Sequence, residues 1–180
     1  YRGLSSIKSF NVLGISCKNK LLRKNIPDKL KIYKSWKELI SDKKLDAIVI
    51  SSPPKTHKKI IKFAIKKNKH IFCDKPVTAS FKEISYICNL LKNKKICNFV
   101  NYEFVNIEAF KIFKKKYLNK IGLNKICVNW HLNIPLKKRA SWKDSHALGG
   151  GYFFNYICHI LFYIENMIGK INLENSYFET

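Results

Sequence analysis

The first hundred residues alternate between short apolar runs and stretches whose apolar residues recur at helical spacing. The run Ala47–Ile50 has no polar interruption, which is typical of a strand covered on both faces of a sheet. After it, Ile60, Ile61, Ala64 and Ile65 repeat along one helical face. By the same criteria we expect further strands over 10–16, 31–33, 70–73 and 96–102.

Helix-start signals fall between these predicted strands. Ser35 and Ser80 are each followed three residues later by a glutamate, which is the capping-box pattern. Ser52 is expected to cap the next helix, with Pro53 in its first turn. Repeated strand–helix units of this kind predict an α/β fold with a parallel, doubly wound sheet.

The pattern changes after residue 102. We expect a helix over 106–119, a half-exposed strand over 123–133, a long helix from Gly149–Gly151 to about 167, and a last strand from 172. The helix over 106–119 should turn four side chains inward: Ile107, Phe110, Phe113 and Tyr117. This predicts a doubly wound domain over 1–103 and part of an α+β domain over 104–180. Because the chain starts at Tyr1 and stops within a predicted strand, we expect a piece of a longer protein.

Composition favours a globular protein of a reducing compartment. The apolar fraction of 46% is ample for a core, and the most apolar run, 152–164, is shorter than the roughly 20 residues of a membrane span. No signal peptide is visible at the N-terminus. The six cysteines form no Cys-x-x-Cys pair, so we expect buried free thiols, a cytoplasmic location and no metal site.

The net charge of +23 raises nucleic acid as a partner. Three observations argue against it. Only Arg2, Arg23 and Arg139 could supply bidentate base contacts, the lysines are scattered over nearly every predicted helix, and the abundance of Lys, Asn and Ile matches A/T-rich codons. A basic nucleic-acid-associated domain is therefore the least favoured of the functions considered.

Lys75 follows a predicted strand, between Asp74 and Pro76. The carboxyl ends of parallel strands are where open α/β sheets bind ligands. A lysine there can donate to a substrate oxygen and stabilise an alkoxide. The alternative is that Lys75 is one more surface lysine in a lysine-rich chain.

Asn155 and His159 are four residues apart, so they share one face of the helix that follows the three glycines. A histidine there can take a hydroxyl proton as a general base. The alternative is a core histidine with a purely structural hydrogen bond. His57 has the same two interpretations, since it could only pack on the Pro53–Pro54 turn.

Four motifs in order resemble one family: SSPPKTH, KKNKHIFCDKP, VNYEF and GGGYFFNYICH. This arrangement is similar to the Gfo/Idh/MocA oxidoreductases, the relatives of glucose–fructose oxidoreductase and inositol dehydrogenase, from Phe10 onward. The resemblance implies a Rossmann-like fold and NAD(P)-dependent hydride transfer at a hydroxyl or carbonyl of a sugar, sugar nucleotide or cyclitol. It also implies a role in carbohydrate metabolism and a homo-oligomer when full length.

The resemblance also implies roles for individual residues. Lys75 matches the lysine that orients and polarises the reacting oxygen, His159 matches the general acid/base, and Asn155 stands beside them where many members have aspartate. Tyr102 would lie near the substrate. The cofactor would be contacted by three groups of residues: Ser16, Cys17 and Lys18; Ser51, Ser52, Pro53, Pro54 and His57; and Asp74 and Lys75.

The sequence also departs from the family. Asp74 replaces the usual glutamate, Phe162 stands where an aspartate is often seen, and Asn155 cannot raise the basicity of His159. Gly3 and Gly14 do not supply the Gly-x-Gly-x-x-Gly loop of a Rossmann domain, so we expect the first strand to be lacking and the second domain to be cut short. A catalytically impaired relative with a binding or regulatory role is therefore the alternative function.

The end of the strand over 10–16 bears on cofactor choice. NAD enzymes usually place an acid there to hold the ribose 2′-hydroxyl, and this chain has Ser16-Cys17-Lys18-Asn19 instead. Without an acid, and with Lys18 and Lys20 nearby, the site favours NADP over NAD.

Overall fold

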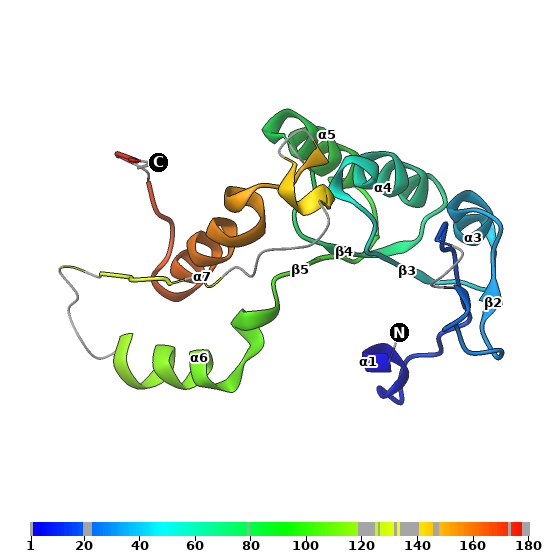
Figure 1. Ribbon diagram of the computed structural model, residues 1–180, viewed down its shortest axis with the longest axis horizontal. Coiled ribbons are helices and arrows are strands. Elements are labelled where there is room, and N and C mark those ends of the chain that lie inside the picture. The colour runs from blue at the N-terminus through cyan, green and yellow to red at the C-terminus, as the bar shows by residue number, and fades with distance from the viewer. Residues whose placement is uncertain are drawn as a thin grey trace. The chain divides into compact units, whose positions relative to one another are not determined.

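The computed structural model divides the chain into two compact units, Tyr1–Val100 and Asn101–Thr180 (Figure 1). It describes residues 2–19, 23–78, 80–118, 125, 127–131, 133, 141–145, 148–172 and 174–177. Lys20 and Arg139 lie outside these ranges.

Parallel strands organise the first unit. After the short helix α1 (Arg2–Ser5), β1 (Gly14–Ile15) pairs with β2 (Lys31–Ile32), so the strand expected over 10–16 is much shorter than predicted. A second sheet has the order β3–β4–β5, from Ala47–Ile50, His70–Asp74 and Asn98–Asn101. β3 and β4 run parallel, with Ile50 opposite Cys73. The predicted α/β class with parallel pairing is confirmed.

Helices follow the strands as the sequence predicts. Ser35 caps α3 (Trp36–Ser41) by accepting from the Glu38 amide at 3.1 Å, and Ser80 caps α5 (Phe81–Leu91) by accepting from the Glu83 amide at 3.3 Å. The expected Ser52 cap is wrong. A 3-10 turn, η1 (Pro54–Thr56), precedes α4 (His57–Lys66), and Ser52 Oγ bonds the Thr56 hydroxyl at 2.6 Å instead.

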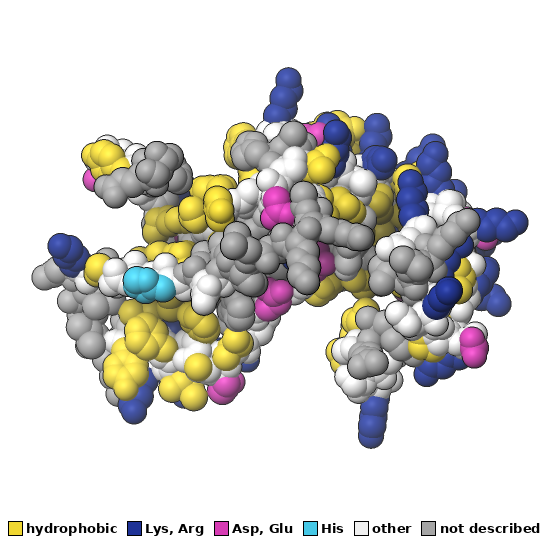
Figure 2. All heavy atoms as spheres, in the orientation of Figure 1, with side chains coloured by type: hydrophobic (Ala, Val, Ile, Leu, Met, Phe, Trp, Pro, Cys, Tyr) yellow, Lys and Arg dark blue, Asp and Glu magenta, His cyan; other side chains and the backbone are white. Residues whose placement is uncertain are grey.

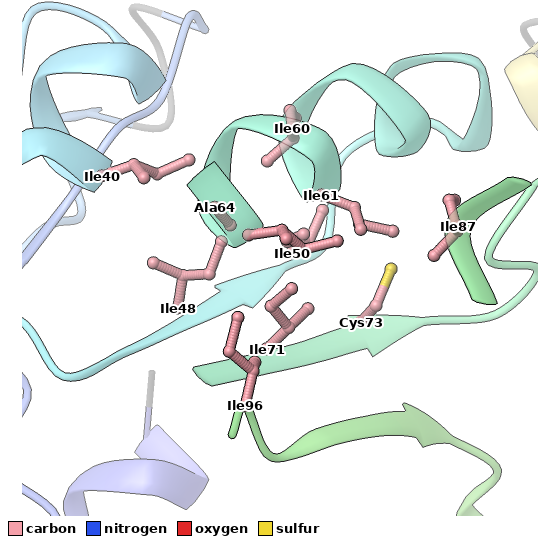
Figure 3. Close-up of a cluster of buried hydrophobic side chains, with 11 residues drawn as sticks. Ile40, Ile48, Ile50, Ile60, Ile61, Ala64, Ile71, Cys73, Ile87 and Ile96 are labelled. Carbon is pink, nitrogen blue, oxygen red and sulfur yellow. The ribbon is translucent and has the colours of Figure 1, made fainter. Parts of the chain in front are cut away.

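The core of the first unit lies between the sheet and these helices (Figure 3). Ala64 and its neighbours on α4 pack against the β3 and β4 side chains that point the same way, and Ile87 of α5 joins them. The buried set also includes Ile40, Ile48, Ile50, Ile60, Ile61, Ile65, Ile71, Cys73 and Ile96. Each aliphatic side chain of this size contributes roughly 1.5–3 kcal/mol when buried, so this cluster is the main source of stability in the unit.

The opposite face of the same sheet is open, which corrects the expectation that Ala47–Ile50 is covered on both sides. Val49 is 48% exposed, and Phe72 and Phe99 are 37% and 49% exposed although their rings stack at 5.3 Å. Burial alternates along β3 because α4 and α5 pack on one side only. Among the described residues, none buries the second side.

The second unit is built from short, irregular helices. A 3-10 turn, η2 (Glu103–Asn106), leads into α6 (Glu108–Phe113) and a π-helical turn, η3 (Lys114–Leu118). Farther along come the 3-10 turn η4 (Trp142–Asp144), the π-helical turn η6 (Phe153–Ile157) and α7 (Cys158–Ile168). Three of the four side chains expected to point inward from 106–119 remain about half exposed: Ile107, Phe113 and Tyr117.

The two strands expected in the second unit are not strands where the structure describes them. Residues 125, 127–131 and 133, and residues 172 and 174–177, have no regular structure. A strand needs a hydrogen-bonding neighbour, and none pairs with either segment in the described part of this unit. Apolar alternation alone therefore overpredicted both.

The remaining composition-based expectations have mixed outcomes. All six cysteines are free, but only Cys73 is buried, whereas Cys88, Cys97 and Cys127 are exposed. In Figure 2 the Lys and Arg side chains of the first unit stand over several elements. Within the described ranges, no helix is long and apolar enough to cross a membrane and no cluster of metal-ligating side chains occurs.

Candidate functional site

Two polar turns meet at the carboxyl edge of the β3–β4 pair. Since Ile50 lies opposite Cys73, the turn that starts at Ser51 and the turn that starts after Asp74 leave the sheet side by side. Ser51 and Pro53 are exposed, Ser52 is partly buried and Pro54 is buried. The first turn is held by the Thr56 hydroxyl, which donates to the Pro53 carbonyl at 2.8 Å. Pro54 is thus buried beneath the turn. Residues Ser51–Pro53 form its accessible surface, which a ligand could contact.

His57 lies beneath these two turns and not along their surface. Its side chain is 1% exposed. Nε2 is 2.6 Å from the Ser52 carbonyl oxygen in the first turn, and Nδ1 is 3.0 Å from the Pro76 carbonyl oxygen in the second. The histidine that the family resemblance places against the cofactor therefore contacts the backbones of both turns from below.

Cys73 packs against the His57 ring, with Sγ 3.4 Å from Nδ1. Burial, together with the negative charge of Asp74, raises the pKa of the Cys73 thiol to about 12. The thiol therefore keeps its proton at neutral pH, and it donates to the Asp74 carbonyl at 3.3 Å. Cys73 is a protonated neighbour of His57 and not a nucleophile.

Asp74 and Lys75 are the last polar residues of the β4 edge, and both are partly buried. Lys75 directly precedes Pro76, whose carbonyl His57 holds. The backbone that carries the Lys75 side chain is therefore fixed by a contact within the first unit. A lysine ammonium at the end of a parallel strand can donate to a ligand oxygen that lies over the edge.

The end of β1 carries the third predicted cofactor group. Ser16 and Cys17 are partly buried and Lys18 is exposed. Arg23 donates through Nε to the Cys17 carbonyl at 2.7 Å, which holds its guanidinium group at this strand end. Sequence reasoning missed Arg23, although its rarity among so many lysines was a signal that could have drawn attention to it.

In the second unit, Asn155 lies in the π-helical turn η6 with its side chain buried. Its amide nitrogen donates to the Lys143 carbonyl at 2.8 Å and the Gly151 carbonyl at 3.0 Å. A carboxylate could make neither bond, because it has no hydrogen to donate. The Asn at this position therefore ties the turn around η4 to the start of the helix.

The three glycines at 149–151 let the start of the helix lie close to the backbone of the turn around η4. The Gly151 amide donates to the Lys143 carbonyl at 2.8 Å. A Cβ on Gly150 would collide with the carbonyl oxygens of Trp142 and Lys143, and Gly149 and Gly151 have φ of 83° and 89°. The run is therefore a tightly packed turn and not a plain flexible segment.

His159 lies one turn after Asn155 and is 7% exposed. Its Nδ1 is 3.0 Å from the Tyr163 hydroxyl, and its ring meets Tyr102 edge-on at 5.7 Å. Tyr102 in turn stacks on Phe162 at 4.0 Å. Asn155 and His159 share a buried face as predicted, and Tyr163, which sequence reasoning missed, is the hydroxyl partner at the i+4 spacing.

Tyr102 is a neutral hydroxyl in this aromatic cluster. Burial, with a smaller contribution from Cys158, raises the pKa of Tyr102 to about 12. It therefore stays protonated and can donate a hydrogen bond. The pairing of Lys75, in the first unit, with His159, in the second, stays a prediction.

Comparisons with known proteins agree with the parallel fold. The family described as an oxidoreductase family with an NAD-binding Rossmann fold matches residues 10–102. An uncharacterized oxidoreductase of Schizosaccharomyces pombe is 26% identical over 133 residues, which is 73% of this chain and 36% of that protein. The myo-inositol 2-dehydrogenase of Thermotoga maritima is 29% identical over 72 residues, which is 40% of this chain and 22% of that enzyme.

Among solved structures, the NAD-binding protein of Listeria innocua superposes with a TM-score of 0.73 at 26% identity. The match covers 93% of this chain and 50% of that protein. The chain thus spans about half of that structure, and about a third of the S. pombe protein's length.

Proposed function

Because the chain belongs to the Gfo/Idh/MocA family of oxidoreductases with an NAD-binding Rossmann fold, we propose that the protein transfers a hydride between NAD(P) and a hydroxyl or carbonyl carbon of a sugar, sugar nucleotide or cyclitol. The observation that carries the proposal is the pairing of Ile50 with Cys73, which brings the Ser51–Pro53 surface and Lys75 to one edge of the sheet. The myo-inositol dehydrogenase among the relatives supports a polyol or sugar as the substrate class.

The described residues fit two ends of such a cofactor. The Ser51–Pro53 surface, Asp74 and Lys75 would face its nicotinamide end. Ser16, Lys18 and Arg23 would face its adenosine ribose, at the end of β1. Gly14 is the only glycine between residues 10 and 102, so we assign no residue to the pyrophosphate.

The cofactor, when bound, supplies or accepts the hydride. Lys75 would donate a hydrogen bond to the reacting oxygen and stabilise its negative charge. His159 would take or return the hydroxyl proton, with its ring held by the Tyr163 hydroxyl at Nδ1. Tyr102 would donate a hydrogen bond to the substrate.

The test replaces Lys75 by Ala in the protein at the length that its gene encodes. We expect turnover of polyol or sugar substrates to fall about 100-fold or more, because a donor to the developing alkoxide is lost. Binding of NADPH, measured by fluorescence, should change little. Lys82→Ala, an exposed lysine on α5, is the matched control. Equal turnover in both variants would reject the role of Lys75.

The cofactor proposal is NADP in preference to NAD. It rests on the absence of an acid at the end of β1 and on Arg23, which hydrogen-bonds the Cys17 carbonyl there. Arg23→Ser should weaken NADPH binding about tenfold, since a charge-assisted bond to the 2′-phosphate is lost. The same change should leave NADH binding unaltered. Equal affinity of the unmodified protein for the two cofactors would contradict the preference.

Asn155 favours a second candidate, a catalytically impaired relative with a binding or regulatory role. Asn155 has an amide where many family members have a carboxylate, and this amide donates to two backbone carbonyls. Reduction of NADP by any member of a panel of polyols and sugars would count against this candidate. We also propose a cytoplasmic location, which the six free cysteines support, and a homo-oligomer, which only the family resemblance supports.

A further inference from the structure

Four aromatic side chains of the second unit, the proposed general base among them, form a closed cycle of contacts. The centroid of the His159 ring lies 5.7 Å from that of Tyr102 and 5.8 Å from that of Tyr163. Phe162 contacts both of these tyrosines, with ring centroids 4.0 Å from Tyr102 and 6.4 Å from Tyr163. We call these four residues the aromatic cycle. Each of its members touches two others.

Three members of the aromatic cycle come from one helix and the fourth comes from a distant part of the chain. His159, Phe162 and Tyr163 share one face of α7, because they are three and four residues apart. Tyr102 follows β5, so its contact with Phe162 joins two segments of the second unit. Tyr163 is 2% exposed and also packs on Phe110 at 5.4 Å. The described ring contacts of Tyr102, in contrast, are with His159 and Phe162.

The two described ring contacts of Tyr102 differ in geometry. Its plane is inclined by 83° to the His159 ring, which is an edge contact. Its plane is within 13° of the Phe162 ring, which is a stack. A stacked neighbour covers one whole face of a ring and so limits its tilt. Because the tyrosine oxygen lies in the plane of its ring, Phe162 sets the direction of the Tyr102 hydroxyl relative to His159.

Phe162 cannot take part in the chemistry itself, because its side chain has no atom that donates, accepts or carries a proton. Any effect of Phe162 on the reaction must therefore pass through the rings that it touches. In this chain the side chain three residues after His159 is a ring that stacks on Tyr102, at the position where the related sequences often have aspartate. The contact made from this position is thus aromatic and not ionic.

We propose that Phe162 is a positioning residue, which stacks on Tyr102 and fixes the Tyr102 hydroxyl beside His159. The hydroxyl proposed to donate to the substrate and the histidine proposed to move its proton are then held in one geometry. A misplacement of about 1 Å in such a pair costs up to about 100-fold in rate. The catalytic consequence rests on the proposed function, whereas the stack that holds Tyr102 does not.

The stack is tested by the proton NMR signals of the Tyr102 ring, in the protein at the length that its gene encodes. Protons that lie over the face of a neighbouring ring are shifted upfield by its ring current. Phe162→Leu keeps an apolar side chain but removes the ring, so the Tyr102 signals should move downfield. Phe162→Tyr keeps a ring and should retain them. Tyr33, which is buried in the first unit, is the control. Unchanged Tyr102 signals in Phe162→Leu would overturn the proposal.

The positioning role is tested by steady-state kinetics of the same variants. Phe162→Leu should lower kcat about tenfold and change KM less, because the donor and the base are still present but misaligned. Phe162→Tyr should restore kcat, and Phe162→Met, a second variant without the ring, should match Phe162→Leu. Unchanged kcat in Phe162→Leu, or a change confined to KM, would reject the role.

Phe153→Leu is the matched control for these kinetics. Phe153 is exposed and meets Phe154 edge-on at 5.5 Å, so its loss removes an aromatic contact that involves no member of the aromatic cycle. We expect kcat of this variant to equal that of the unmodified protein. An equal fall in Phe153→Leu and Phe162→Leu would indicate general loosening of the helix and would also reject the role.

The two measurements separate this inference from the proposed function. A protein without turnover on any polyol or sugar would reject the proposed function and the catalytic consequence, while the Tyr102 signals would still show whether Phe162 holds that ring. Full turnover in Phe162→Leu with shifted Tyr102 signals would reject the positioning role and leave the proposed function standing. A fall in kcat together with shifted Tyr102 signals would support both.

Discussion

The two units each contain a buried histidine, and the partners of the two rings differ in kind. His57 faces backbone carbonyls with both nitrogens, and these carbonyls belong to two different turns. His159 faces a side-chain hydroxyl with Nδ1 and lies among aromatic rings. A carbonyl only accepts, whereas a hydroxyl both donates and accepts, so the Tyr163 hydroxyl can pair with Nδ1 of His159 whether or not that nitrogen carries a proton. The contacts of the first ring are thus all within the backbone of two turns and a thiol, whereas the hydroxyl beside the second ring is compatible with the proton transfer that we propose for it.

The largest expected effect comes from replacing the His57 ring by Phe, with His159→Phe as the comparison. His57→Phe takes the ring away from the Ser52 and Pro76 carbonyls, and an unsatisfied carbonyl costs about 1–3 kcal/mol, so the free energy of unfolding should fall by about 2–6 kcal/mol if both are left without a partner. His159→Phe should cost about 1 kcal/mol, because the Tyr163 hydroxyl can turn to another partner. Chemical denaturation followed by circular dichroism measures both. An equal fall in the free energy of unfolding in the two variants would show that the two rings contribute equally to stability, and would contradict the comparison.

A smaller effect is expected at Asn155, which holds the helix that carries His159. Asn155→Asp places a carboxylate against two carbonyls, so the free energy of unfolding should fall by about 1–3 kcal/mol at pH 7. The loss should shrink toward pH 4, because a protonated carboxyl can again donate one hydrogen. Denaturation at the two pH values tests this, and a loss that grows with acidity would contradict it.

The smallest effect is expected at the hydroxyl that holds the second ring. Tyr163→Phe removes one hydrogen bond and should lower the free energy of unfolding by about 1 kcal/mol. Tyr152→Phe, at a side chain that is 72% exposed, is the matched control and should lie within about 0.5 kcal/mol of the unmodified chain. A loss of several kcal/mol in Tyr163→Phe would mean that the contact between Tyr163 and His159 stabilises the fold as strongly as the contacts of His57 do.

The sequence predicted the parts of the fold that depend on near neighbours. The bounds of β3, the buried stripe of α4 and the caps at Ser35 and Ser80 all agree with the structure. Each of these follows from residues within a few positions of one another. The two strands expected in the second unit are absent from the residues that the structure describes there, because strand formation needs a pairing partner that alternation does not reveal.

For the candidate site, the sequence predicted the positions but not the contacts. It placed Lys75 after a strand and put Asn155 and His159 on one helical face, and both placements hold. It did not find Arg23 at the Cys17 carbonyl or Tyr163 beside His159. It also could not tell that Asn155 serves two carbonyls, one of which lies twelve residues away.

By itself, then, the amino-acid sequence determined the order of strands and helices, the parallel class and the family of this protein, because periodicity, capping and motif spacing are short-range properties. Only the tertiary structure decided that one face of the β3–β5 sheet stays open and that His57 bonds the carbonyls of Ser52 and Pro76. Those outcomes depend on which elements pack together and which acceptors they bring to a ring. The partners lie five and nineteen residues from His57, and no local pattern specifies that both are carbonyls.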